Sequence, residues 1–383
     1  MVSAAVLAAL AALYVGITQG SPSTLGFGAK SNVVNLGYAR YRGNLSYPDT
    51  VAYLGLPYAE PPLGERRYRA PLSLNLTRIE EEEGGKEIDA TEYPDFCIQE
   101  TTGAGDAGGA GSEDCLKVNV YAPAGAKRGD NLPVLVYIHG GGYRYGNPRN
   151  WPFDHWIHQS PNVVIVSVYY RLGSFGFLAV PEFEDSSIGD FNVGFQDQTM
   201  ALKWVQAHIE AFGGNPKKVT INGQSAGGGS VELHLVATGQ EGLFSGAIAQ
   251  SVYRAPTPSP EQVQPLFDFF SENAGCGNGS VTEKVACLRT ASISDISRAQ
   301  DLATTTAFAG GYKLFRPVVD GKIITAPPTL SILAGNFTKV PVIVGSTSNE
   351  TVSTPSTVED GLRFLFPALD DSDLDEFAEV SNT

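Results

Sequence analysis

Positively charged residues are scarce in this chain. Its 383 residues include 26 Lys and Arg against 41 Asp and Glu, which gives a formal net charge of −15. A protein that binds nucleic acid needs a basic face to neutralise phosphates, so this balance argues against a nucleic-acid partner. The acidic composition by itself does not identify a substrate.

Histidine and cysteine, the usual ligands of zinc, are also few. There are five histidines and four cysteines, and no two cysteines form a C-x-x-C pair. Zinc sites commonly use such pairs with nearby histidine, so we expect no metal site. A G-x-G-x-x-G pattern occurs within residues 103–111, but it follows no expected strand and opens no amphipathic helix. We therefore interpret it as a loop and not as a dinucleotide site.

The N-terminus carries an apolar run, residues 2–17, which falls short of the ~20 residues that span a bilayer. We interpret residues 1–20 as a signal peptide that ends at Gly20. A short membrane anchor is the alternative. The mature chain, residues 21–383, is then expected to be secreted, with no stable membrane insertion. Five N-x-S/T sequons are compatible with secretion: Asn44, Asn75, Asn278, Asn336 and Asn349.

The cysteines are Cys97, Cys115, Cys276 and Cys287. An even number behind a signal peptide predicts two disulfides, and the count leaves three connectivities open. Sequential pairing would close two short loops.

Short runs rich in Val and Ile alternate with longer helical patterns, which predicts a mainly parallel sheet covered by helices. The expected strands cover residues 133–138, 163–169, 219–221 and 340–344. Leu202, Val205, Ile209 and Phe212 share one face of an expected helix, which Gly213 and Gly214 stop. Neither an internal repeat nor a polar linker divides residues 21–383, so we expect one domain.

The motif that indicates chemistry is Gly223-Gln224-Ser225-Ala226-Gly227, a G-x-S-x-G. Acyl transfer from an ester needs a hydroxyl exposed on a strained turn, and the two glycines leave room for that turn. An expected strand precedes the motif and an expected helix, residues 226–236, follows it. We therefore predict that Ser225 is a nucleophile. A glycine-rich turn that only packs is the alternative.

A second glycine motif, His139-Gly140-Gly141-Gly142, follows the strand that ends at Ile138. The tetrahedral intermediate of acyl transfer carries negative charge on the former carbonyl oxygen. Backbone N–H groups of such a loop can approach it and stabilise it. We predict that the amides of Gly141, Gly142 and Ala226 form this oxyanion hole. An ordinary glycine loop is the alternative.

Several further stretches resemble the type-B carboxylesterase/lipase family, which includes the cholinesterases and many fungal lipases. The matching segments are residues 53–59, 113–121, 170–177, 197–205 and 212–216. The resemblance implies the α/β-hydrolase fold, a central mostly parallel sheet flanked by helices. It also implies the sequential disulfides Cys97–Cys115 and Cys276–Cys287 and an ion pair between Arg67 and Glu113.

The same resemblance identifies Glu350 as the acid of a catalytic triad, because it ends a pattern like G-x-x-x-x-E. From the residues alone, Glu350 is a carboxylate after the C-terminal end of an expected strand, where such sites gather. The sequon at Asn349 is expected to be unused, since a glycan would crowd the site. Gln224 stands where the family often has Glu, which predicts a weaker preference for cationic substrates.

The general base of such a triad is a histidine that follows the acid in the chain. Residues 351–383 contain none, and all five histidines precede Glu350. His139 is expected to pack in the oxyanion loop, and His155 and His158 to lie near the substrate mouth. His208 and His234 fall on expected helices. The chain also stops within an expected helix, residues 373–380, so we interpret the C-terminal part of the fold as missing.

We therefore predict a secreted carboxylic ester hydrolase that forms an acyl-enzyme on Ser225, acts on a small-molecule or lipid ester, and needs no cofactor. One alternative is a catalytically inactive, secreted binding protein of the same fold, because the histidine is absent. Another is a thioesterase, peptidase or amidase with the same machinery. The acyl and alcohol parts of the substrate and the oligomeric state stay open.

Overall fold

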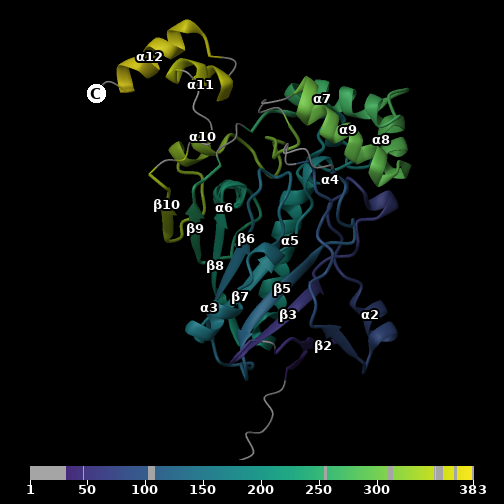
Figure 1. Cartoon of the computed structure of the whole chain (residues 1–383), viewed down its shortest axis with the longest axis vertical. Coiled ribbons are helices and arrows are strands. Elements are labelled where there is room, and N and C mark those ends of the chain that lie inside the picture. Colours follow the sequence, from purple (N-terminus) through teal and green to yellow (C-terminus); the bar gives the residue numbers. More distant parts are fainter. Residues whose placement is uncertain are drawn as a thin grey trace, which may run out of the picture. The chain divides into compact units, whose positions relative to one another are not determined.

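Seven strands form the central sheet, in the order β10-β9-β8-β6-β7-β5-β3 (Figure 1). The computed structural model describes residues 32–45, 47–101, 108–253, 257–308, 314–348, 350, 357–365 and 369–381. The expected signal peptide lies outside the described residues. Within those ranges, no helix has the length and apolar character needed to cross a membrane.

The five strands from β7 to β10 in this order run parallel, and β5 and β3 are antiparallel to their neighbours at one side. The sheet is therefore mostly parallel, as the sequence predicts. All four expected strands are present, as β6, β7, β8 and β10. The strands are β3 (Thr50–Pro57), β5 (Lys117–Pro123), β6 (Leu132–Ile138), β7 (Val164–Val168), β8 (Gly214–Gln224), β9 (Gly246–Gln250) and β10 (Val342–Gly345).

A separate small sheet has the order β1-β2-β4, with strands β1 (Val33–Asn35), β2 (Arg40–Gly43) and β4 (Glu87–Ala90). The helices are α2 (Leu76–Glu83), α3 (Asp154–Gln159), α4 (Gly173–Phe177), α5 (Val193–His208), α6 (Ala226–Val236), α7 (Pro260–Asn273), α8 (Val281–Thr290), α9 (Ile293–Leu302), α10 (Pro328–Leu333), α11 (Val358–Leu365) and α12 (Asp371–Ser381). Shorter helical turns are η1 (Gly64–Arg66), η2 (Pro148–Asn150), η3 (Pro181–Glu184), η4 (Ile209–Phe212) and η5 (Ala303–Ala307).

Burial explains why the central strands have uninterrupted apolar sequences. All five residues of β7 are buried, because helices and loops cover both faces of the sheet. Helix α6 packs on β6, β8 and β9, whereas α3 packs on β3 and β5. Helix α5 continues into η4 and ends at Gly213, which adopts a left-handed φ of 87° and turns the chain into β8.

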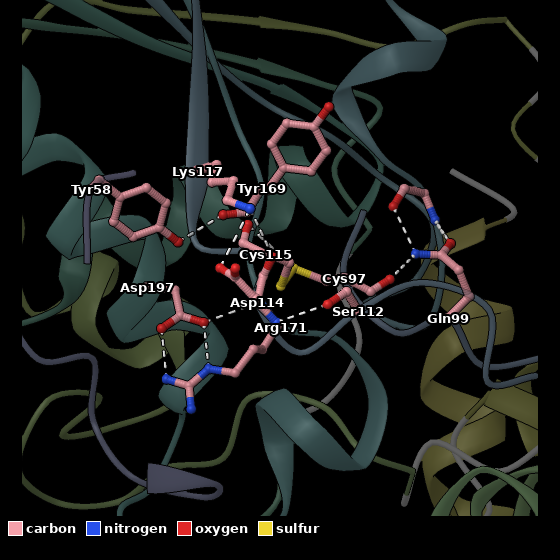
Figure 2. The surroundings of a disulfide bond; sticks show 11 residues. Tyr58, Cys97, Gln99, Ser112, Asp114, Cys115, Lys117, Tyr169, Arg171 and Asp197 are labelled. Carbon is pink, nitrogen blue, oxygen red and sulfur yellow. Dashed lines mark hydrogen bonds and ion pairs between the residues drawn. A yellow bond between two sulfur atoms is a disulfide. The ribbon is translucent and has the colours of Figure 1, made fainter. Parts of the chain in front are cut away.

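The two disulfides are those that the resemblance implies. Cys97 pairs with Cys115 (Figure 2), and Cys276 pairs with Cys287. The implied ion pair is also present: Arg67 donates from Nε and Nη2 to the two carboxylate oxygens of Glu113, both at 2.7 Å. Such a bidentate pair fixes orientation as well as distance.

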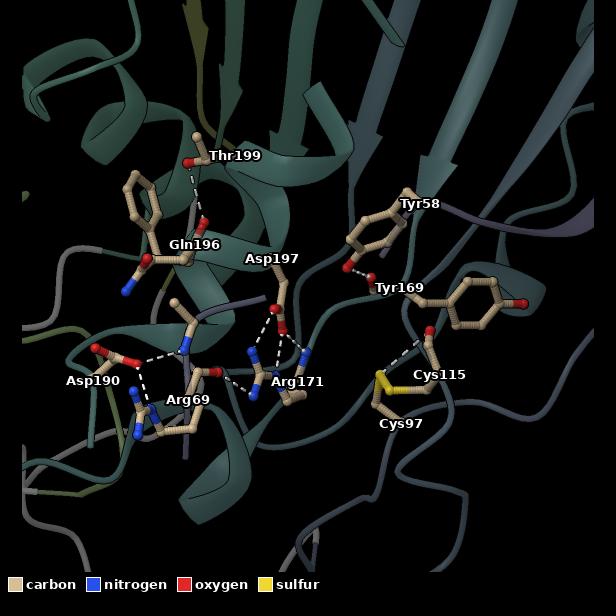
Figure 3. A network of polar contacts seen from close by, with 12 residues as sticks. Tyr58, Arg69, Cys97, Cys115, Tyr169, Arg171, Asp190, Gln196, Asp197 and Thr199 are labelled. Atoms are coloured by element: carbon tan, nitrogen blue, oxygen red, sulfur yellow. Dashed lines mark hydrogen bonds and ion pairs between the residues drawn. A yellow bond between two sulfur atoms is a disulfide. The ribbon is translucent and has the colours of Figure 1, made fainter. Parts of the chain in front are cut away.

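A second bidentate pair lies between Arg171 and Asp197, both of which are buried (Figure 3). Arg171 donates to Asp197 from Nε and Nη2 at 2.8 and 2.7 Å, and from its backbone amide at 3.1 Å. Its Nη1 also donates to the carbonyl oxygen of Arg69. A buried charge is tolerated when it is paired and hydrogen-bonded in this way. The pair joins the loop after β7 to α5.

The outer strand β10 is exposed along its length. Ile343 is 65% exposed and Val344 is 69% exposed, although β10 pairs with β9 through its other edge. Leu330 and Leu333, on helix α10, which precedes β10 in the sequence, are exposed as well. An exposed apolar edge strand can pair with another strand, so this edge is a site of potential association.

Candidate active site

The parallel strands bring the predicted site residues to one edge of the sheet. Parallel strands end at the same edge, and ligands of open α/β sheets bind there. His139 follows β6, Ser225 follows β8, and Glu350 comes five residues after the end of β10. Neighbouring strands in the order β6-β8-β9-β10 therefore supply the predicted oxyanion loop, the predicted nucleophile and the predicted acid.

Ser225 stands between β8 and α6, with φ 57° and ψ −121°. A positive φ is strained for a residue with a side chain and persists only where the surroundings enforce it. Two bonds hold this turn: the Ser225 amide donates to the carbonyl oxygen of Gln250 on β9, and the Tyr253 amide donates to that of Ser225, both at 3.0 Å. The turn is the strand-to-helix elbow that the G-x-S-x-G motif predicts.

Both motif glycines are required by close backbone contact. A Cβ on Gly223 would lie 2.2 Å from the carbonyl oxygen of Gly227, and a Cβ on Gly227 would lie 2.1 Å from that of Ile138. A Cβ closer than 3.0 Å to another atom forces that atom to shift, and here the atoms that would have to shift belong to the backbone. Helix α6 therefore starts directly against the end of β6.

The predicted oxyanion loop lies against the elbow. A Cβ on Gly140 would be 2.5 Å from the carbonyl oxygen of Gln224 and 3.0 Å from the Cβ of Ser225. Gly141 and Gly142 have φ values of 110° and 65°. Ala226 is the first residue of α6, so its amide has no acceptor within the helix and lies at the positive end of the helix dipole. The three predicted donors thus belong to two segments in contact.

Glu350 is tied to the ends of β9 and β10. Its Oε1 accepts from the Thr347 amide at 2.6 Å, while the Ser251 amide donates to the carbonyl oxygen of Gly345 at 2.7 Å. The bond from the Thr347 amide, followed by one from the Ser251 side chain, lowers the pKa of Glu350. The carboxylate is exposed and ionised at neutral pH. Its neighbour Asn349 lies outside the described residues.

His139 and His234 are buried and used in packing. His139 donates from Nδ1 to the carbonyl oxygen of Gly140 at 2.8 Å and stacks on Tyr170. The two ring nitrogens of His234 contact the side-chain amides of Gln240 and Gln198, at 2.9 and 3.1 Å. Burial lowers the pKa of each of these two histidines to about 4.

The expectation that His155 and His158 lie near the substrate mouth is wrong. Both are on α3, which packs at the start of β3: the Thr50 hydroxyl donates to the carbonyl oxygen of Asp154, and His158 Nδ1 lies 3.2 Å from that of Pro48. β3 runs in the same direction as β7, so its first residue, Thr50, lies at the edge of the sheet opposite the C-terminal strand ends that lead to Ser225. The fifth histidine, His208, packs on Tyr38 and Trp204.

No group of three or more metal-ligating side chains occurs within the described ranges. The groups that the predicted site residues bring to this edge are a hydroxyl, a carboxylate and backbone amides.

Together, the sheet order and the strand-to-helix elbow define an α/β-hydrolase. The sequence profile described as the Carboxylesterase family matches residues 30–371, and the chain belongs to this family. A crystal structure of Aspergillus niger EstA is similar, with a TM-score of 0.78 and 34% identity, over 91% of this chain and 68% of that one.

Curated relatives include an acetylcholinesterase from Electrophorus electricus, 36% identical over 80% of this chain and 49% of its own. An acylcarnitine hydrolase from Mus musculus is 35% identical over 78% of this chain and 51% of its own. The chain thus spans about half the length of these relatives.

Proposed function

We propose that this protein hydrolyses carboxylic esters through an acyl-enzyme on Ser225. The observation that carries the proposal is the strained turn at Ser225, held against the glycine loop that follows β6. Strain of this kind gathers at functional sites, and a turn that only packed would not require it. Family membership supports the same reaction class.

In the proposed reaction the Ser225 hydroxyl oxygen attacks the ester carbonyl carbon and gives its proton to a base. Negative charge develops on the carbonyl oxygen, where the amides of Gly141, Gly142 and Ala226 stabilise it; losing one such donor typically costs ~3 kcal/mol. The bond to the alcohol then breaks, and the alcohol leaves with the proton. Water hydrolyses the acyl-enzyme by the same steps in reverse order.

The base is proposed to be a histidine other than the five in this sequence. His139 and His234 are buried inside the protein. His155 and His158 lie at the opposite edge of the sheet. His208, the last residue of α5, packs on Trp204 of the same helix. Glu350 is exposed and ionised, which suits a carboxylate that orients an incoming imidazole. The relatives are about twice as long as the matched part of this chain, which leaves ample sequence for that residue.

Imidazole rescue tests the proposal with the chain as it is. Loss of a triad histidine alone can cost about 10⁶ in kcat, so we expect very slow turnover of p-nitrophenyl butyrate. Added imidazole should raise the rate of the wild type above that of Ser225→Ala, which corrects for direct hydrolysis by imidazole. Equal rates for the two proteins at every imidazole concentration would contradict the proposal.

A second candidate function, a non-catalytic binding protein, is favoured by one observation: none of the five histidines is placed to act on Ser225. It predicts no difference between wild type and Ser225→Ala in the rescue experiment. The positions of both glycine motifs argue for the enzyme, because a binding protein has no use for a strained serine packed against a glycine loop.

The neutral Gln224 supports a proposal on specificity. Its Oε1 lies 3.4 Å from the position of a Cβ on Gly140, so the amide stands beside the oxyanion loop. An amide supplies no negative charge to attract a cationic substrate. We expect neutral esters to be hydrolysed faster than choline esters, and Gln224→Glu to reduce that difference.

We also propose that the protein is secreted. Both disulfides support an oxidising compartment, as does the apolar run before residue 20. Peptide sequencing of protein collected from culture medium should find a new N-terminus at Ser21. Recovery only inside cells, with Met1 retained, would contradict this proposal.

A further inference from the structure

The loop that carries the proposed oxyanion hole is short and conformationally strained. The amides of Arg144 and Tyr145 both donate back to the carbonyl oxygen of Gly141, at 3.0 and 3.2 Å. Tyr143 has a positive φ of 64°, and Gly146 has one of 107°. Such a backbone does not hold itself in place, because the non-glycine residue at positive φ costs energy that the surroundings must offset.

Gln99 holds the far end of this loop. Its Oε1 accepts from the Gly146 amide at 2.6 Å, and its Nε2 donates to the Gly146 carbonyl oxygen at 3.2 Å. The same Nε2 donates to the carbonyl oxygen of Cys97 at 2.8 Å. Figure 2 shows Gln99 beside the disulfide between Cys97 and Cys115. One side chain thus satisfies both backbone groups of Gly146 and connects them to a covalently closed loop.

Glu100 holds the middle of the loop. Its amide donates to the carbonyl oxygen of Arg144 at 2.8 Å, and its Oε1 accepts from Arg144 Nε at 2.9 Å. Arg144 also donates to the carbonyl oxygen of Thr101 at 2.8 Å, and the Thr304 hydroxyl donates a hydrogen bond to the Glu100 carboxylate. Glu100 is only 1% exposed, so this ion pair is screened little by solvent.

We infer that Gln99 is a positioning residue for the proposed oxyanion hole, and that it acts by fixing Gly146 so that Gly141 and Gly142 keep their backbone conformation. The ion pair between Glu100 and Arg144 is the second anchor of the same loop. Gln99 touches neither Ser225 nor the proposed donors. Its role rests on the proposed function, because it matters for catalysis only if this loop stabilises an oxyanion.

Gln206 offers a matched control. It is also half-buried, and its Nε2 also donates to two backbone carbonyl oxygens, those of Pro216 and Leu243, at 2.8 and 2.9 Å. It lies on α5, away from the glycine loop. Gln99→Ala removes three bonds to backbone atoms and Gln206→Ala removes two, so a purely structural role predicts effects of similar size from both.

The experiment measures the rate at which a fluorophosphonate labels Ser225 in the presence of imidazole, together with Tm. Removing an oxyanion donor costs about 10²–10³ in rate, so a loosened loop should cost about ten- to a hundredfold. We expect that loss for Gln99→Ala and less than about twofold for Gln206→Ala, with similar Tm. Equal labelling rates for the two variants would overturn the inference.

Hydrogen exchange separates this inference from the proposed function. Gln99→Ala should speed amide exchange in the peptide covering residues 139–146, and Gln206→Ala should not. If the wild type is never labelled but exchange rises, the proposed function fails and the anchoring role of Gln99 stands. If exchange in this peptide does not change, the positioning role is wrong whatever the labelling result.

Discussion

The carbonyl oxygen of Ile138 lies only 2.1 Å from the point that a Cβ on Gly227 would occupy. Ile138 is the last residue of β6, and Gly227 is the second residue of α6. This contact brings the helix that starts after Ser225 directly onto the strand that leads into the proposed oxyanion loop. The second glycine of the G-x-S-x-G motif is thus required because the start of α6 packs directly on the end of β6.

Gly227→Ala should therefore be strongly destabilising. Overpacking against atoms that cannot move costs about 1–3 kcal/mol or more, and here the obstacle is backbone. Gly345→Ala is the matched control, because a Cβ there meets no atom within 4 Å and φ is not positive; a change within about 0.5 kcal/mol is expected. Urea unfolding measures both. Equal stability of the two variants would show that the elbow is looser than the contact implies.

Stability should fall as pH falls from about 6.5 toward 4. His139 and His234 are neutral when folded, with pKa values of about 4, whereas an unfolded histidine titrates near 6.5. Below pH 6.5 the unfolded state binds more protons than the folded state. Each of these two histidines should therefore lower the free energy of unfolding by about 2 kcal/mol between pH 7.5 and 5, and should leave it unchanged above pH 7.5. Urea unfolding at both pH values measures the loss.

His234→Gln removes one of the three histidines whose pKa burial lowers, the third being His208, and should reduce this pH dependence, whatever it does to stability at pH 7.5. A wild-type pH dependence in His234→Gln would contradict the assignment of this histidine as a buried, neutral group.

The exposed edge at β10 should promote self-association. Ile343→Lys places a charge on a residue that is 65% exposed, so stability should change by less than about 0.5 kcal/mol while association decreases. Sedimentation velocity over a range of protein concentrations measures this. Ile221→Lys, on the buried strand β8, should unfold the protein instead. Unfolding by Ile343→Lys would show that the edge is covered in the native protein.

The sequence predicts the parts of the fold that have a strong local pattern. Helix α6 has the expected bounds, residues 226–236, because the glycine elbow fixes its start. Strand β9 has no such signal: its sequence Gly-Ala-Ile-Ala-Gln contains a single β-branched residue, although its Gln250 holds the Ser225 turn. Its place becomes apparent only when neighbouring strands supply hydrogen bonds.

Two features of the site depend on long-range geometry and could not be predicted. His155 and His158 follow the oxyanion loop closely in sequence, but the chain returns across the sheet to its opposite edge before α3 begins. Gln99 contacts Gly146 across 47 residues, through bonds from a side chain to the backbone that leave no pattern in sequence. A motif indicates which residues react, and the packed structure determines what holds them.

The central claim is that Ser225 is the nucleophile, and the most direct test is to find the residue that a fluorophosphonate modifies. Tandem mass spectrometry of the digested protein, after reaction with the probe and imidazole, should place the phosphonyl group on the peptide that contains Ser225. Ser225→Ala should remove it, and Ser251→Ala, at the end of β9, should retain it. An adduct on Ser251 or any other residue, or one that survives Ser225→Ala, would contradict the account.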